Sequence, residues 1–225
     1  MKIKIKIILP HIYLITYPSQ YELCMSFVRM QEFYESPKFR GKYFTLEDYM
    51  DHWSKTKGNG SFTYPATWNG FNVPGDVIKN WMEVCNDNDD KMRDREHDLL
   101  YYINKLMLKE GLQGVHSDDL DKIYVIGAHG KSFNIKDIVG HESAHAFYRV
   151  YPEYKESCDK ILNKINPEEM NKMRNSLLAL GYNRDVVLDE VQAYSSVDSG
   201  MLYNSLKKEF KSNFENFKKN LVKKS

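Results

Sequence analysis

The chain has 225 residues, of which 42% are hydrophobic and 28% charged, with 12 glycines and 7 prolines. This composition excludes disordered, collagen-like and disulfide-scaffold proteins, and the length favours a single domain with a sizeable core. The formal net charge of +1 gives no overall attraction to nucleic acid or to an anionic membrane, so neither is expected as a partner.

The three cysteines, Cys24, Cys85 and Cys158, form no Cys-x-x-Cys pair, and their odd number favours a reducing compartment over a secreted disulfide framework. The apolar run that follows Lys6 is too short for a signal peptide. No stretch approaches the ~20 consecutive apolar residues that span a bilayer. We therefore expect a cytoplasmic protein, while the oligomeric state is not predicted.

The N-terminal segment predicts two strands and a helix. Lysine and isoleucine alternate in the first residues, which predicts a strand over residues 2–9, and a second strand is expected over residues 12–17. Ser19 and Glu22 have the spacing of a capping box, so we expect a helix that begins there and ends before Pro37.

A second helix is expected after Thr45, because Asp48 repeats the capping spacing and apolar residues follow at helical intervals. It ends at the breaker sequence of residues 57–60. Residues 61–74 are too irregular for a helix and too interrupted for a long strand. We expect this loop to pack its aromatic side chains onto the core, namely Phe62, Tyr64, Trp68 and Phe71.

The remaining chain predicts one strand and several helices. A charged helix is expected over residues 90–110, a short β-branched strand over 122–126, and a helix over 136–150. Another helix begins near Pro152.

Asn166 caps the next helix, and Gly181 is the expected residue beyond its C-terminal end. Asn183 caps a helix that runs to about Val197, and a lysine-rich helix or tail fills residues 202–225. Acidic residues interrupt its lysines, so we interpret them as a solvated face. The sequence therefore predicts one α+β domain over residues 1–225, with an α/β part over about 1–150 and a helical part over about 151–225.

His141-Glu142-Ser143-Ala144-His145 matches the pattern HExxH and lies within an apolar helical segment. Residues four apart share a helix face, so both imidazoles can reach one metal ion. Glu142 lies beside them and can accept a proton from a metal-activated water. The motif predicts a zinc site with His141 and His145 as ligands and Glu142 as general base.

A catalytic zinc site needs a third protein ligand, and Glu190 is the candidate. On a helix, its neighbours one turn away are Val186, Val187, Ala193 and Tyr194, so this carboxylate lies on an apolar face. Burying an unpaired carboxylate costs several kcal/mol, so Glu190 requires a cation, a metal or a hydrogen-bond network. Asp189 faces another way, either to hold a ligand imidazole or to lie in solvent.

The HESAH motif with Glu190 45 residues after His145 resembles the gluzincin class of zinc metallopeptidases. The resemblance covers about residues 122–198. It implies His141, His145 and Glu190 as zinc ligands, Glu142 as catalytic base and a zincin-like fold. The chain departs from the thermolysin pattern, because Tyr194 stands where that pattern has an aspartate, and it has no metzincin third histidine or Met-turn.

Two further features are expected by analogy with zincins. The strand over residues 123–126 becomes the sheet edge along which an extended peptide pairs. A side chain must also stabilise the oxyanion of the tetrahedral intermediate, and the strongest candidates are Tyr194 and His129, with Tyr182 and Tyr148 as others.

The sequence thus predicts a zinc-dependent metallopeptidase that acts on a peptide or protein substrate. One alternative is a zinc-stabilised interaction module without turnover, in which a fourth protein ligand such as His129 or Cys158 closes the site. Another is a metal-free helical binding protein.

Overall fold

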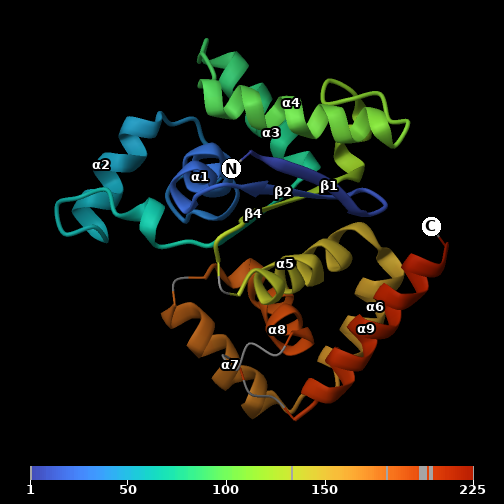
Figure 1. Cartoon of the computed structure of the whole chain (residues 1–225). Helices are drawn as coiled ribbons and strands as arrows, with labels where there is room; N and C mark the ends of the chain where they lie inside the picture. The colour runs from blue at the N-terminus through green and yellow to red at the C-terminus, as the bar shows by residue number, and fades with distance from the viewer. Residues whose placement is uncertain (1, 133, 181, 198–201, 203–204, 225) are drawn as a thin grey trace. The chain divides into compact units, whose positions relative to one another are not determined.

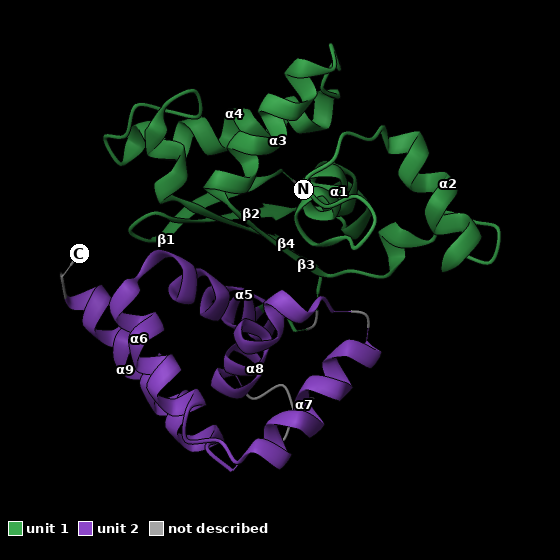
Figure 2. Ribbon diagram, turned by 180° about the vertical axis from the view of Figure 1, so that it is seen from behind, with its two compact units in different colours: residues 1–135 green, residues 136–225 purple. Residues whose placement is uncertain are grey.

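The computed structural model shows an α+β protein whose chain divides into two compact units, residues 1–135 and 136–225 (Figures 1 and 2). The structure describes residues 2–132, 134–180, 182–197, 202 and 205–224. The division falls at the beginning of the helix that carries HExxH, so this helix belongs to the second unit. Within the described residues, no helix combines the length and the apolar character needed to cross a membrane.

The first unit contains a four-stranded mixed sheet with the strand order β1-β2-β4-β3. β1 (Lys4–Leu9) and β2 (Ile12–Tyr17) form an antiparallel hairpin, as the alternating sequence predicts. β4 (Tyr124–His129) pairs in parallel with β2. β3 (Gly70–Pro74) pairs with β4 in the antiparallel sense. The sequence predicts three of these four strands, and β3 is the strand that was not expected.

The prediction that residues 123–126 form a sheet edge is wrong. β4 lies inside the sheet, because Val125 is paired with Tyr13 of β2 on one side and with Val73 of β3 on the other. Its backbone groups are thereby used within the sheet. In the described part of the first unit the edge strands are β1 and β3.

Three helices cover one face of this sheet (Figure 1), namely α1 (Gln20–Glu35), α3 (Gly75–Asp87) and α4 (Asp94–Lys109). The 3₁₀ turn η1 (Tyr64–Ala66) packs beside α1, and α2 (Leu46–Thr56) precedes it in the chain. A further 3₁₀ turn, η2 (Asp118–Lys122), packs against α3 before β4.

The predicted N-terminal caps of α1 and α2 are confirmed. The Ser19 hydroxyl accepts a hydrogen bond from the backbone N–H of Glu22 at 3.2 Å. Thr45 and Asp48 form both halves of a capping box, with distances of 3.1 Å and 2.8 Å. These side chains satisfy backbone donors that the first helical turn leaves unpaired.

The segment from residue 61 to 87 departs most from the prediction, because it contains β3 and α3, neither of which was expected. The expected packing of aromatic side chains is confirmed for Tyr64 and Phe71, which are buried in the core, whereas Trp68 is 42% exposed. The N–H of Gly75 donates to the carbonyl of Ile123 at 2.9 Å, which joins the beginning of α3 to the residue before β4.

The second unit is helical throughout its described part. Its α5 and α6 confirm the predicted helices over 136–150 and after Pro152, and Asn166 caps α7 as expected. The predicted glycine beyond that helix, Gly181, lies outside the described residues. The elements are α5 (Ile135–Val150), α6 (Pro152–Leu162), α7 (Pro167–Ala179), the 3₁₀ turn η3 (Arg184–Val186), α8 (Val187–Ser196) and α9 (Lys207–Lys224).

The core of the second unit is aromatic and forms around α5. Phe147 of α5 is fully buried and stacks on Phe214 of α9, with 5.1 Å between ring centroids. Tyr154 of α6, also fully buried, meets Phe147 edge to face at 5.5 Å. This packing fixes the helix that carries the HExxH motif.

Candidate metal centre

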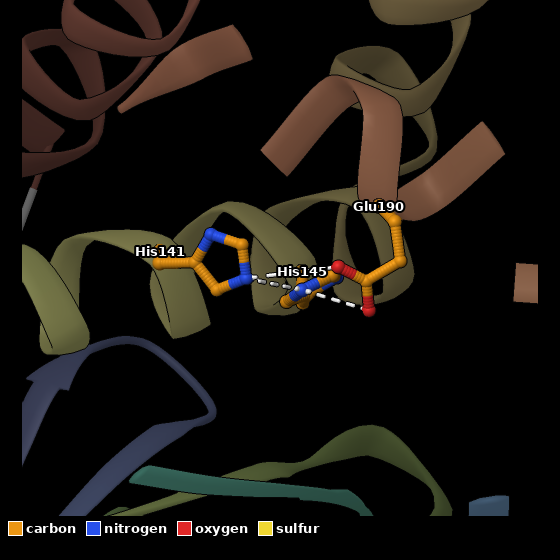
Figure 3. Close-up of side chains that lie close together, drawn as sticks. All are labelled: His141, His145 and Glu190. Carbon is orange, nitrogen blue, oxygen red and sulfur yellow. Dashed lines mark hydrogen bonds and ion pairs between the residues drawn. The ribbon is translucent and has the colours of Figure 1, made fainter. Parts of the chain in front are cut away.

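The two histidines of the motif point to the same place from successive turns of α5 (Figure 3). Their Nε2 atoms are 3.2 Å apart, and their ring centroids are 4.8 Å apart. His145 is buried with 4% of its surface exposed. The helical spacing of four residues thus brings both imidazoles together, as the sequence predicts.

Glu190 reaches the same place from α8 (Figure 3). Its Oε2 lies 3.7 Å from His141 Nε2, and its Oε1 lies 3.7 Å from His145 Nε2. The potential ligand atoms of the three residues all lie within 4.8 Å of one another. This is the group of metal-binding donors that the described residues bring together, and it consists of the three ligands named from the sequence.

The two Nε2 atoms are within hydrogen-bond distance, and which of them carries a proton depends on the tautomers of the two rings. Burial, with the charge of His145, lowers the pKa of His141 to about 3, so His141 is neutral. Burial also opposes a charge on His145, but Asp189 and Glu190 outweigh it and hold the pKa of His145 well above its usual value.

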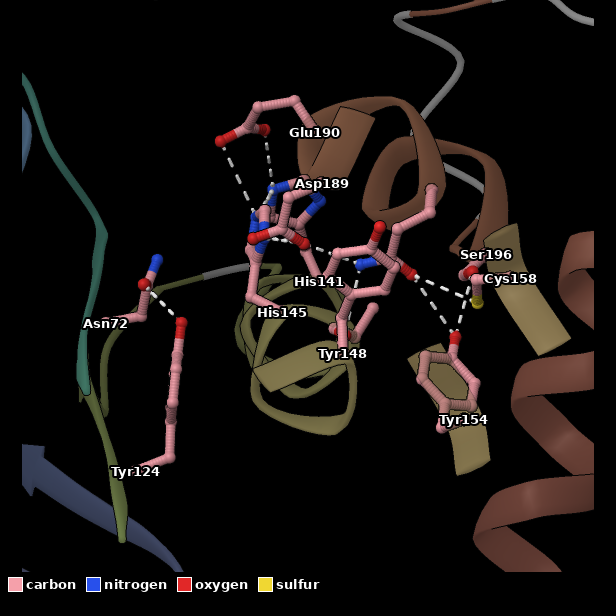
Figure 4. Close-up of polar contacts among 12 residues, drawn as sticks. Asn72, Tyr124, His141, His145, Tyr148, Tyr154, Cys158, Asp189, Glu190 and Ser196 are labelled. Atoms are coloured by element: carbon pink, nitrogen blue, oxygen red, sulfur yellow. Dashed lines mark hydrogen bonds and ion pairs between the residues drawn. The ribbon is translucent and has the colours of Figure 1, made fainter. Parts of the chain in front are cut away.

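Asp189 binds the far nitrogen of His145, with 2.9 Å between Oδ1 and Nδ1 (Figure 4). Of the two roles that the sequence left open for Asp189, the structure favours the contact with a histidine. The same oxygen accepts a hydrogen bond from Nε2 of Gln192 at 2.9 Å. A metal-ligating histidine usually makes such a contact through its second nitrogen.

Glu142 follows His141 on α5 and is buried at 9% exposure. Its charge contributes to the raised pKa of His145, which places the carboxylate in the electrostatic surroundings of the three-residue group. This position is compatible with the expected role in proton transfer.

Tyr194 is the oxyanion candidate that the structure brings to the three-residue group. Its ring centroid lies 4.5 Å from that of His141, and its hydroxyl lies 2.9 Å from the hydroxyl of Tyr182.

The other two candidates have different partners. Tyr148 donates a hydrogen bond to Asp159 Oδ1 at 2.5 Å. His129 ends β4 in the first unit, where its Nε2 lies 2.9 Å from Asn69 Oδ1. Its proposed part in catalysis stays a prediction.

Cys158, named as a possible fourth ligand, is not part of the three-residue group. Its Sγ lies 3.9 Å from Gln192 Oε1 and 3.4 Å from Asn213 Nδ2. Sequence reasoning did not single out Gln192, whose side chain is fully buried beside Asp189. The available signal was a glutamine three residues after Asp189, between apolar Val191 and Ala193.

Comparison with models of protein families, with curated proteins and with solved structures found no match to this chain.

Proposed function

We propose that this protein is a zinc-dependent metallopeptidase of the gluzincin type, with a zincin-like α+β fold. The observation that carries this proposal is the convergence of His141, His145 and Glu190, whose ligand atoms lie within 4.8 Å of one another on two helices. Two imidazoles and one carboxylate are a common donor set of catalytic zinc, with the fourth position left to water or substrate.

The chemical character of this group supports a metal ion. A buried carboxylate and two buried or half-buried imidazoles are costly to assemble unless they share a cation or hydrogen bonds. Nitrogen and oxygen donors suit zinc, and they also bind neighbouring divalent metals, so metal identity is part of the test.

The proposed reaction is hydrolysis of a peptide bond. Zinc bound at this group would polarise a carbonyl and lower the pKa of a water molecule. Glu142 acts as general base toward the attacking water and then returns the proton to the leaving amine. Tyr194 donates its hydroxyl hydrogen to the developing oxyanion, with Tyr182 holding that hydroxyl.

The substrate is proposed to be a peptide or protein. We also propose a reducing, cytoplasmic environment, which is supported by three cysteines that are all buried and free of disulfides.

The first experiment measures metal content by elemental mass spectrometry on the purified full chain. About one zinc per chain is expected in the wild type, with loss in His145→Ala and in Glu190→Ala. His116→Ala and Glu153→Ala are matched controls, since both residues are exposed and lie outside the three-residue group. A wild type that is metal-free and takes up no added zinc would overturn the proposal.

The second experiment separates an enzyme from a zinc-stabilised module. Glu142→Gln is expected to keep the metal and to lose hydrolysis of a peptide library, because a glutamine cannot take the proton. Equal hydrolysis by Glu142→Gln and the wild type would contradict the proposed base. A metal-loaded wild type that cleaves no peptide would favour the interaction module.

A further inference from the structure

Gln192 is fully buried, and both ends of its side-chain amide are hydrogen-bonded. Nε2 donates to the backbone carbonyl of Ala144 at 3.1 Å and to Asp189 Oδ1 at 2.9 Å. Oε1 accepts from the hydroxyl of Tyr154 at 3.3 Å and faces Sγ of Cys158 at 3.9 Å. These contacts connect Gln192 of α8 with α5 and with α6.

The direction of this amide follows from its partner on α5. The carbonyl of Ala144 can only accept a hydrogen bond, so the amide nitrogen must face it. A flipped amide would place two oxygens against each other in a buried environment, where unsatisfied polar groups are costly. The nitrogen that faces Ala144 also faces Asp189, so the Asp189 oxygen at this position must be an acceptor.

That same oxygen faces His145. Asp189 Oδ1 accepts a hydrogen bond from Gln192 and lies 2.9 Å from Nδ1 of His145. Because this oxygen is an acceptor, Nδ1 of His145 must carry a hydrogen and donate it to Asp189. The other ring nitrogen, Nε2, then faces His141 and Glu190. The backbone carbonyl of Ala144 thus sets the orientation of the Gln192 amide, and Asp189 links this amide to His145 on the same helix.

We infer that Gln192 is a positioning residue that fixes the proton of His145 on Nδ1 by orienting Asp189, and thereby reserves Nε2 for a metal ion. The assignment of the proton stands on the hydrogen-bond geometry alone, whereas its purpose rests on the proposed metal site. Ser196 extends the network, since its hydroxyl lies 3.3 Å from that of Tyr154 (Figure 4).

The test reads the imidazole proton directly. In ¹⁵N-labelled full chain, long-range ¹H–¹⁵N spectra assign the His145 nitrogens, and solvent exchange of Nδ1–H is followed with and without added Zn²⁺. The wild type is expected to show a slowly exchanging Nδ1–H in both forms. Gln192→Met is expected to accelerate this exchange about tenfold or more and to weaken Zn²⁺ binding about 10- to 100-fold. Gln113→Met is the matched control, because Gln113 is exposed in the first unit.

A second pair of variants guards against loss of fold in Gln192→Met. In Asp189→Asn, an intact Gln192 should direct the new amide oxygen toward His145, so the slow Nδ1–H persists. In Asp189→Asn/Gln192→Met, nothing orients that amide and the slow exchange is lost. The inference is overturned if Nδ1–H exchange stays slow in both Gln192→Met and Asp189→Asn/Gln192→Met. It is also overturned if slow exchange is already lost in the single variant Asp189→Asn. A slow Nδ1–H in a protein that binds no zinc would refute the proposed function and leave the positioning role intact.

Discussion

The ring of Tyr194 lies 4.5 Å from the imidazole of His141, centroid to centroid, and is tilted by 52° to it. Tyr194 is four residues after Glu190 on α8, so one helix supplies both the third proposed ligand and the ring that covers the first. The hydroxyl of Tyr182 holds the Tyr194 hydroxyl at 2.9 Å. The phenol is therefore fixed at both its ring and its oxygen.

Tyr194→Phe keeps the ring beside His141 and removes the hydroxyl. We expect metal content to be unchanged and kcat for peptide hydrolysis to fall about 10²- to 10³-fold, the usual cost of deleting one oxyanion donor. The measurement is steady-state kinetics beside elemental analysis, with Tyr101→Phe, an exposed residue of α4, as control. An unchanged kcat would remove Tyr194 from the mechanism.

Asp189→Asn keeps an oxygen that can accept from His145 and removes its negative charge. A carboxylate on the second nitrogen makes an imidazole a stronger ligand, so zinc affinity is expected to fall about tenfold. Competition with a chromophoric chelator measures this change. Asp185→Asn provides the control, since Asp185 is exposed in η3. Equal affinity in Asp189→Asn and the wild type would mean that the 2.9 Å contact does not tune the ligand.

The three proposed ligands could be found from the sequence because local helix geometry decides their placement. His141 and His145 share a face at a spacing of four, and the apolar neighbours of Glu190 mark its face as buried. Gln192 could not be assigned in this way. Its partners, Ala144 and Tyr154, belong to other helices, and the hydrogen-bond direction appears only when α5, α6 and α8 pack together.

The missed elements of the first unit have a similar cause. Residues 70–74 contain glycine and proline and look like a loop, yet they form β3 because β4 offers an antiparallel partner, with Val73 opposite Val125. Once β3 occupies that side, β4 can no longer be an edge. The strand pattern predicts that residues 123–126 are extended, but the number of neighbours depends on a segment more than 50 residues away in sequence.

Glu32 of α1 gives the first unit a pH-dependent stability. Burial raises the pKa of Glu32 above its usual value, although hydrogen bonds from Tyr64 and Tyr49 act in the opposite direction. Because the pKa is higher in the folded than in the unfolded state, its contribution to stability is full below the unfolded value of 4.5. The contribution is lost as the pH rises through the folded pKa.

In Glu32→Gln, a neutral side chain of nearly the same shape replaces the carboxyl group, so this pH dependence is removed. The Tm of Glu32→Gln relative to the wild type should therefore increase between about pH 4 and about pH 7. Thermal unfolding followed by circular dichroism measures the difference. Glu47→Gln, at an exposed position of α2, should show no comparable trend. A constant Tm difference across this range would mean that Glu32 has the same pKa in both states.

Two glycine-to-alanine substitutions should change stability in opposite directions. A Cβ on Gly75 would lie 1.7 Å from the backbone oxygen of Leu120, so the beginning of α3 and η2 must move apart. We expect Gly75→Ala to lower the free energy of unfolding by about 1–3 kcal/mol, as for other overpacked sites. A Cβ on Gly140, inside α5, would meet Val197 Cγ1 at 3.5 Å, which is ordinary contact.

Gly140→Ala is therefore expected to raise the free energy of unfolding by about 0.5–1 kcal/mol, because alanine loses less backbone entropy than glycine in a helix interior. Urea unfolding of both variants and the wild type gives the two values, provided that each transition is two-state. Zinc content should be unchanged in Gly140→Ala, although the substitution is next to His141, because it strengthens the helix without moving the imidazole. Destabilisation by Gly140→Ala would show that α5 is constrained at this point by more than its helical conformation.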